Sequence, residues 1–143
     1  MSDVVLIQIF SCWFLTGLIW LVQVLVYPNF RLIGPVEFKN FHDFHMKRIT
    51  WIVAPVMGLE LLSAIVLIAN DRSTFNLLNG VSILLLWALT GLINVPTHNR
   101  LQHEVELTKH RLIVGNWPRT IIWSLRSLVW IWVMHLQLIK GIV

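Results

Sequence analysis

Residues 4–27, VVLIQIFSCWFLTGLIWLVQVLVY, run for 24 positions without a charged side chain. An α-helix needs about 20 apolar residues to cross the hydrocarbon core of a bilayer, so this segment is long enough to span it. A secretory signal peptide begins with basic residues and ends at a small-residue cleavage site. Here Asp3 precedes the apolar run and no such site follows. We therefore predict a membrane-spanning helix that is retained.

Three more segments have the same character, at residues 51–69, 75–95 and 119–140. Each is long enough to span a bilayer. Proline lacks a backbone N–H and disfavours helix in the preceding residue, so Pro28 and Pro96 are expected to end the first and third helices. Pro118 suits the first turn of the fourth helix. The chain is thus predicted to be one all-α membrane domain over residues 1–143, a bundle of four transmembrane helices.

The composition supports a membrane domain and excludes several other classes of protein. Of the 143 residues, 57% are apolar and only 13% are charged, whereas soluble domains carry about 25% charged residues. Disordered and collagen-like chains need more charge, proline or glycine. The net charge of +4 does not indicate a nucleic-acid partner, because lysine and arginine gather in the cytoplasmic loops of membrane proteins. The single Cys12 excludes an intrachain disulfide and a multi-thiolate metal site.

The basic residues predict the orientation of the helices. Residues 28–50 and 96–118, the two long connections, hold most of them: Arg31, Lys39, Lys47, Arg48, Arg100, Lys109 and Arg111, with Arg119 directly after. The positive-inside rule places both connections in the cytoplasm and both termini outside, as in a multi-pass protein of the bacterial inner membrane. Apolar residues recur at helical spacing in both connections, so we predict two amphipathic cytoplasmic segments.

The two halves of the chain resemble each other, which predicts an internal two-fold repeat about an axis along the membrane normal. Each half has an aromatic or apolar residue before a proline, then a histidine-bearing segment, then arginine, threonine and tryptophan. The matching residues are Tyr27, Pro28, His42, His45, Arg48, Thr50 and Trp51 in one half and Val95, Pro96, His103, His110, Arg119, Thr120 and Trp123 in the other. The alternative is chance similarity between two membrane hairpins.

Two charged residues interrupt the apolar helices. Glu60 and Arg126 lie at similar distances from the cytoplasmic starts of the second and fourth helices. A lone charge at this depth costs at least about 2.5–3.5 kcal/mol. Two interpretations remain open. The pair is a structural ion bridge, or it is catalytic, with Glu60 as a metal ligand or proton acceptor that Arg126 holds.

One face of the fourth helix carries alternating arginine and tryptophan. Arg119, Trp123, Arg126 and Trp130 have the spacing of a single helical face. Guanidinium groups and indole rings can bind an anion or a carboxylated ring between them. Anchoring at the membrane interface is the alternative for Arg119 and Trp123. Asn116, Arg119, Trp123 and Arg48 are the predicted cofactor-binding residues.

Three histidines are candidate metal ligands. His42 and His45 lie three positions apart on one helical face, and His98 lies at the matching boundary of the other half. Two imidazoles at this spacing can hold one metal ion. The alternative is a set of solvated surface histidines, which we expect for His103, His110 and His135.

Several short motifs carry a resemblance to known proteins: Tyr27-Pro28, Phe41-His42-Asp43-Phe44-His45, Pro55-Val56-Met57-Gly58-Leu59-Glu60, Val95-Pro96-Thr97-His98 and Asn116-Trp117-Pro118-Arg119-Thr120. Over nearly its whole length the chain resembles small, uncharacterised bacterial four-helix membrane proteins. It is more distantly similar in size and span pattern to the anthrone-oxygenase-like membrane proteins of unknown function. The resemblance implies a shared site at His42, His45, Glu60, His98, Asn116, Arg119 and Arg126, without naming its chemistry.

These residues predict a metal- or haem-binding membrane protein. We expect an oxidoreductase that acts on a hydrophobic molecule dissolved in the membrane, such as a quinone or polycyclic ring, with a transition metal or haem as cofactor. Motifs for nucleotide binding or hydrolysis are absent from the sequence. Two alternatives remain. One is a non-catalytic subunit of a larger membrane complex or a homo-oligomer, and the other is a small carrier in which Glu60 relays protons.

Overall fold

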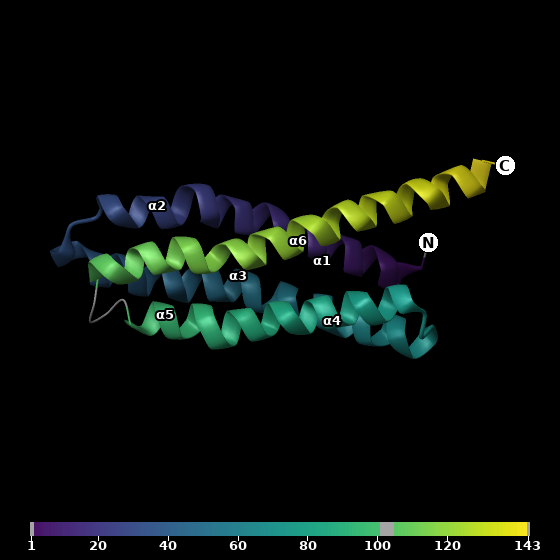
Figure 1. Cartoon of the computed structure of the whole chain (residues 1–143), viewed down its shortest axis with the longest axis horizontal. Helices are drawn as coiled ribbons and strands as arrows, with labels where there is room; N and C mark the ends of the chain where they lie inside the picture. The colour runs from purple at the N-terminus through teal and green to yellow at the C-terminus, as the bar shows by residue number, and fades with distance from the viewer. Residues whose placement is uncertain (1, 101–104, 143) are drawn as a thin grey trace.

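The computed structural model describes residues 2–100 and 105–142 and forms a bundle of four long, antiparallel helical rods (Figure 1). The first rod comprises α1 (Asp3–Leu21), the π-helical turn η1 (Val22–Val26), α2 (Tyr27–Asn29) and the 3₁₀ turn η2 (Phe30–Leu32). The second is α3 (Pro35–Asn70). The third comprises α4 (Thr74–Leu89), the π-helical turn η3 (Thr90–Asn94) and α5 (Val95–Arg100), and the fourth is α6 (Val105–Ile142).

Each rod is long and apolar enough to cross a membrane, which confirms the predicted all-α membrane fold. The outward surfaces are apolar on every helix, with Phe10, Leu62, Leu84 and Leu128 each about 60% exposed. Such surfaces are stable against lipid chains and not against water. The protein is therefore a multi-pass membrane protein in contact with the lipid bilayer.

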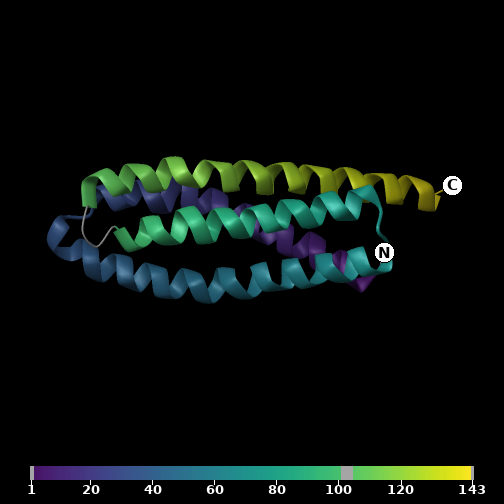
Figure 2. The same ribbon diagram turned by 60° about the horizontal axis from the view of Figure 1, so that its bottom comes forward.

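The two ends of the bundle differ in charge. The first rod begins and α6 ends beside the turn between α3 and α4, and the connection between η2 and α3 lies at the other end (Figures 1 and 2). The basic residues gather at that other end, which we call the basic end: Arg31, Lys39, Lys47, Arg48, Lys109 and Arg111. This arrangement agrees with the predicted grouping of the long connections on one side of the membrane.

The chain continues as a helix through Pro28 and Pro96, although both were expected to end a helix. A proline ring clashes with the carbonyl four residues earlier, which here belongs to Val24 or Leu92. Each of these residues lies at the centre of a π-helical turn, η1 or η3. A π turn widens the helix and accommodates the ring. Both the π turn and the proline recur 68 residues later in the chain, in agreement with the predicted repeat.

The connecting segments are helical, but they are not separate amphipathic helices. Gly34 is extended and Pro35 opens α3, which then runs for 36 residues without a break. At about 1.5 Å per residue, α3 is about 54 Å long and extends beyond a hydrocarbon core of about 30 Å. Residues 35–50 and 105–118 form the first turns of α3 and α6. Residues 101–104, including His103, lie outside the described residues.

Apolar side chains from all four rods fill the centre of the bundle. The main cluster contains Ile9, Cys12, Leu15, Ile19, Met57, Leu67, Leu86, Trp123 and Trp130. A smaller cluster near the basic end contains Val22, Tyr27, Phe30, Phe38 and Leu112. Buried polar side chains lie between and beside these clusters, and they form the candidate site.

Candidate functional site

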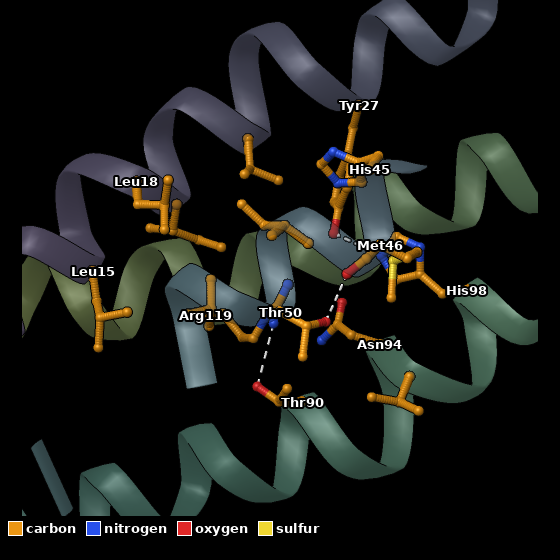
Figure 3. A pocket seen from close by; sticks show the side chains of 15 residues that line it. Leu15, Leu18, Tyr27, His45, Met46, Thr50, Thr90, Asn94, His98 and Arg119 are labelled. Atoms are coloured by element: carbon orange, nitrogen blue, oxygen red, sulfur yellow. Dashed lines mark hydrogen bonds between the residues drawn. The ribbon is translucent and has the colours of Figure 1, made fainter. Parts of the chain in front are cut away.

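A cavity of about 120 Å³ lies between the rods in the half of the bundle nearer the basic end (Figure 3). It is lined by Leu15, Leu18, Ile19, Val22, Tyr27, His45, Met46, Ile49, Thr50, Val53, Thr90, Asn94, Val95, His98 and Arg119. The polar groups lie together, and Leu15 and Leu18 lie at the opposite side of the space. The cavity therefore has an apolar part and a polar part, as amphipathic small molecules require.

Three buried side chains beside the cavity form a chain of hydrogen bonds. The Tyr27 hydroxyl lies 3.0 Å from His98 Nε2, and His98 Nδ1 lies 3.0 Å from His42 Nε2. Their exposed fractions are 3%, 5% and 3% for Tyr27, His98 and His42. A neutral imidazole has one N–H donor and one acceptor nitrogen. Both hydrogen bonds can therefore be donated in the direction from His42 to Tyr27, or both in the direction from Tyr27 to His42.

Aromatic rings hold the two imidazoles in place. The rings of His42 and His98 stack at an interplanar angle of 22°, with centroids 5.2 Å apart. The Phe38 ring stacks on the His42 ring, with centroids 5.8 Å apart and an interplanar angle of 18°. Phe30 presents its ring edge-on to His42 and to His45, at 6.1 and 5.3 Å. This packing leaves the imidazoles little freedom to turn.

The outer nitrogen of His42 faces the surface of the basic end. His42 Nδ1 lies 3.9 Å from a carboxylate oxygen of Asp43. Asp43 is about half exposed and also lies 3.7 Å from the ammonium of Lys39. The hydrogen-bonded chain therefore begins at an aqueous edge and ends at the tyrosine hydroxyl in the cavity.

Arg119 places a guanidinium in the cavity wall, and its partners among the described side chains are neutral. Its Nε donates to Asn116 Oδ1 at 3.1 Å, and its Nη2 contacts the same oxygen. Its Nη1 donates to Thr90 at 3.3 Å, and the guanidinium also faces the Tyr27 hydroxyl. Among the side chains that the structure describes, no carboxylate pairs with Arg119. A buried cation without a counter-ion is unfavourable, so this site is suited to an anion.

Asn116 is itself held by a second polar side chain. Its amide donates to Gln23 Oε1 at 2.8 Å, and Gln23 Nε2 donates to the backbone carbonyl of Ile113 at 3.1 Å. The π turn η1 contains Gln23 and directly precedes Tyr27. The π turn that accommodates Pro28 thus also places the polar side chains of Gln23 and Tyr27 beside α6.

A second polar cluster, which we call the ion-pair cluster, lies nearer the other end of the bundle. It consists of Glu60, Asn79, Trp123 and Arg126. Arg126 Nη1 donates to Glu60 Oε1 at 2.5 Å, and Arg126 Nη2 donates to Asn79 Oδ1 at 3.0 Å. The Trp123 indole donates to the other oxygen of Glu60 at 3.4 Å. The predicted pairing of Glu60 with Arg126 is present, and both side chains are more than nine-tenths buried.

The predicted site residues thus lie in two clusters. His45, His98 and Arg119 line the cavity, and His42 and Asn116 form hydrogen bonds with His98 and Arg119, respectively. Glu60 and Arg126 lie in the ion-pair cluster, and neither is among the described residues that line this cavity. Trp123 is fully buried beside Glu60. Arg48 is exposed, and its guanidinium lies over the Phe44 ring at 5.3 Å.

The geometry gives no support for a metal or haem centre. Within residues 2–100 and 105–142, no three His, Cys, Asp or Glu side chains are grouped so that they could hold a metal ion. Zinc sites in proteins use three or four protein ligands. His42 and His98 instead direct one ring nitrogen each at the other. The arrangement is suited to hydrogen bonding and proton exchange.

The sequence-based prediction did not assign several polar residues of these clusters to the site, among them Gln23, Tyr27, Asn79 and Thr90. Tyr27 was noted as the end of the first span, in the repeat and in the Tyr27-Pro28 motif, but not as a site residue. The signal that could have found Gln23 and Asn79 was their position within apolar helices, where polar side chains are expensive and face the bundle interior. Thr90 carries no such signal, because threonine commonly bonds its own helix, as it also does here with Leu86 at 2.8 Å.

No protein family, curated protein or solved structure matches the chain. The resemblance suggested by the short motifs therefore has no support beyond the shared architecture, a small four-helix membrane protein.

Proposed function

We propose that this protein binds a hydrophobic, membrane-dissolved molecule with an acidic headgroup in the cavity beside Arg119. The observation that carries the proposal is the buried guanidinium of Arg119, which has neutral hydrogen-bond partners and no carboxylate among the described side chains. A carboxylate or an acidic hydroxyl group would supply the missing negative charge. Arginine suits this role because its planar group binds such oxygens in a bidentate manner.

The apolar lining of the cavity supports a hydrophobic ligand. Leu15, Leu18 and Ile19 of α1 line the cavity with apolar side chains, as do Ile49 and Val53 of α3. Tyr27 and His98 lie beside Arg119 at the polar side (Figure 3). A ligand that enters with its apolar body against α1 and its headgroup at Arg119 satisfies both parts of the lining.

This proposal retains the membrane-dissolved substrate expected from the sequence and assigns the histidines a different role. His42, His45 and His98 would act in hydrogen bonding and proton exchange, and the proposal includes neither a metal nor a haem. Glu60 and Arg126 would stabilise the bundle as an internal ion pair.

Binding of dodecanoate labelled with ¹³C at the carboxyl carbon, followed by NMR with the protein in phosphatidylcholine nanodiscs, tests the proposal. We expect saturable binding to the wild type and a loss of at least about tenfold in affinity for Arg119→Gln, since tenfold corresponds to about 1.4 kcal/mol. Arg31→Gln is the matched control, because it removes an exposed positive charge at the same end. Equal binding by all three proteins would refute the proposal.

One observation favours the second candidate, a non-catalytic subunit of a larger membrane complex or a homo-oligomer. The end of α6 projects past the other helices (Figures 1 and 2). Its last turns carry exposed apolar side chains, among them Ile131, Trp132 and Leu138. In this case, cross-linking in membranes through a photoreactive residue at position 138 captures a protein or a second copy of the chain, whereas lipid contact alone yields lipid adducts only.

A further inference from the structure

We propose that His42, His98 and Tyr27 form a proton relay that connects the aqueous edge at Asp43 with the cavity. Only the final transfer, from Tyr27 to a bound headgroup, rests on the proposed function. The connection between the surface and the Tyr27 hydroxyl depends on the hydrogen-bonded chain alone. Proton movement along this chain is an activity distinct from ligand binding.

The relay has one gap at the surface and two direct hydrogen bonds inside. Asp43 Oδ1 and His42 Nδ1 are 3.9 Å apart, a separation across which a single water molecule can bridge. The two internal bonds, from His42 to His98 and from His98 to Tyr27, are 3.0 Å each. Protons move readily along hydrogen bonds of this length, and histidine is the side chain best suited to pass them.

One transfer along the relay is balanced as follows. Tyr27 gives its hydroxyl proton to the anionic headgroup, and the His98 Nε2–H proton replaces it. The His42 Nε2–H proton moves to His98 Nδ1, and a proton from water at the Asp43 edge binds His42 Nδ1. Each protein group ends neutral, as it began, and the polarity of the chain is reversed. The ligand has gained one proton and water has lost one, and return of the ligand's proton to Tyr27 moves each proton back along the chain and resets the relay.

Charged groups lie at both ends of the relay. At the outer end, Asp43 attracts a proton toward His42, and the Lys39 ammonium lies 3.7 Å from the Asp43 carboxylate. At the inner end, the guanidinium of Arg119 faces Tyr27 and would stabilise the anionic headgroup before it is protonated. His45, which is also on α3, lies beside the imidazoles of His42 and His98. On α6, the ammonium of Lys109 lies 4.7 Å from the centre of the Phe38 ring, which stacks on His42. Tyr27, His42 and His98 themselves lie out of water, so exchange with solvent must pass through Asp43 or the cavity.

NMR of the full chain with ¹⁵N-labelled histidine, in phosphatidylcholine nanodiscs without added ligand, tests the relay. We expect a through-hydrogen-bond ¹⁵N–¹⁵N coupling between His42 and His98 in the wild type. We also expect the ring N–H of His98 to exchange with water at least about tenfold faster in the wild type than in His42→Gln, as loss of a general acid–base group predicts. Glutamine can keep a hydrogen bond to His98 but passes no proton through its amide.

The matched control is His110→Gln, which replaces an exposed histidine on α6 and should leave the exchange rate of His98 unchanged. Absence of the coupling in the wild type would overturn the relay without the need for any variant. An exchange rate of His98 that stays the same in His42→Gln would also overturn it. If the coupling and the rate effect are both present but dodecanoate does not bind, the proposed ligand is refuted and the relay stands.

Discussion

Arg126 on α6 and Glu60 on α3 form a direct ion pair, with 2.5 Å between Nη1 and Oε1, inside a bundle where both side chains are almost fully buried. Arg119 is seven positions earlier on the same helix and equally buried, yet its described partners are neutral. Two arginines of one helical face therefore differ in their surroundings. Arg126 is neutralised by Glu60, and Arg119 is the residue at which we propose that an anion binds.

Removal of one partner of the ion pair is predicted to lower the free energy of unfolding strongly. Arg126→Met leaves the Glu60 carboxylate buried without a counter-ion, so we expect the free energy of unfolding to fall by about 3–5 kcal/mol. The double variant Glu60→Met/Arg126→Met removes both charges and should lose less than the single variant. Unfolding in mixed micelles, followed by tryptophan fluorescence, measures both. Strictly additive losses would contradict a direct pair.

Arg119 is predicted to respond differently to the same substitution. Arg119→Met removes a buried charge, which is favourable, but it leaves Asn116 and Thr90 without a donor, which costs about 1–3 kcal/mol for a buried group. The net loss of stability should therefore be smaller than for Arg126→Met. Dodecanoate at about 100 times its dissociation constant should stabilise the wild type by about 2.7 kcal/mol and leave Arg119→Met unchanged. A larger loss for Arg119→Met than for Arg126→Met would show that a structural role dominates.

The start of α4 is predicted to depend on one hydroxyl group. Ser73 is the N-cap residue, and its side chain accepts a hydrogen bond from the backbone N–H of Asn76 at 3.4 Å. Loss of a capping hydroxyl costs about 1 kcal/mol, so Ser73→Ala should lower the free energy of unfolding by this amount. Ser2 is the N-cap of α1 but makes no side-chain cap bond. Ser2→Ala is therefore the control and should have no effect.

The orientation in the membrane is predicted by the basic residues and can be measured by cysteine labelling. In whole cells, an impermeant maleimide should label Arg72→Cys, at the turn between α3 and α4, from outside. It should label Lys39→Cys, at the basic end, only after the cells are permeabilised. Cys12 is fully buried and should stay unlabelled in both cases. The reverse pattern would place the basic end outside the cell, against the positive-inside rule.

Much of the fold could be predicted because its main determinant is local. Four apolar runs of sufficient length can only be helices in a bilayer, since the backbone must satisfy its own hydrogen bonds there. The pairing of Glu60 with Arg126 was also accessible, because two opposite charges at one depth in a bundle have few other partners. The helix boundaries at Pro28 and Pro96 were wrong, because the rule that proline ends a helix does not include the π turn that accommodates it.

The sequence by itself determined the four spans, the basic end and the depth of the buried charges, because length, hydropathy and position along a helix are properties of the chain alone. Only the tertiary structure decided that Tyr27, His98 and His42 meet in one hydrogen-bonded chain and that Arg119 faces a cavity. Tyr27, His42 and His98 come from three separate rods. Along the chain, His98 is 71 positions from Tyr27 and 56 positions from His42. Their meeting depends on how each helix is rotated about its axis when the bundle packs. That rotation is set by side-chain packing across helices and by the π turns, which no spacing within one segment reveals.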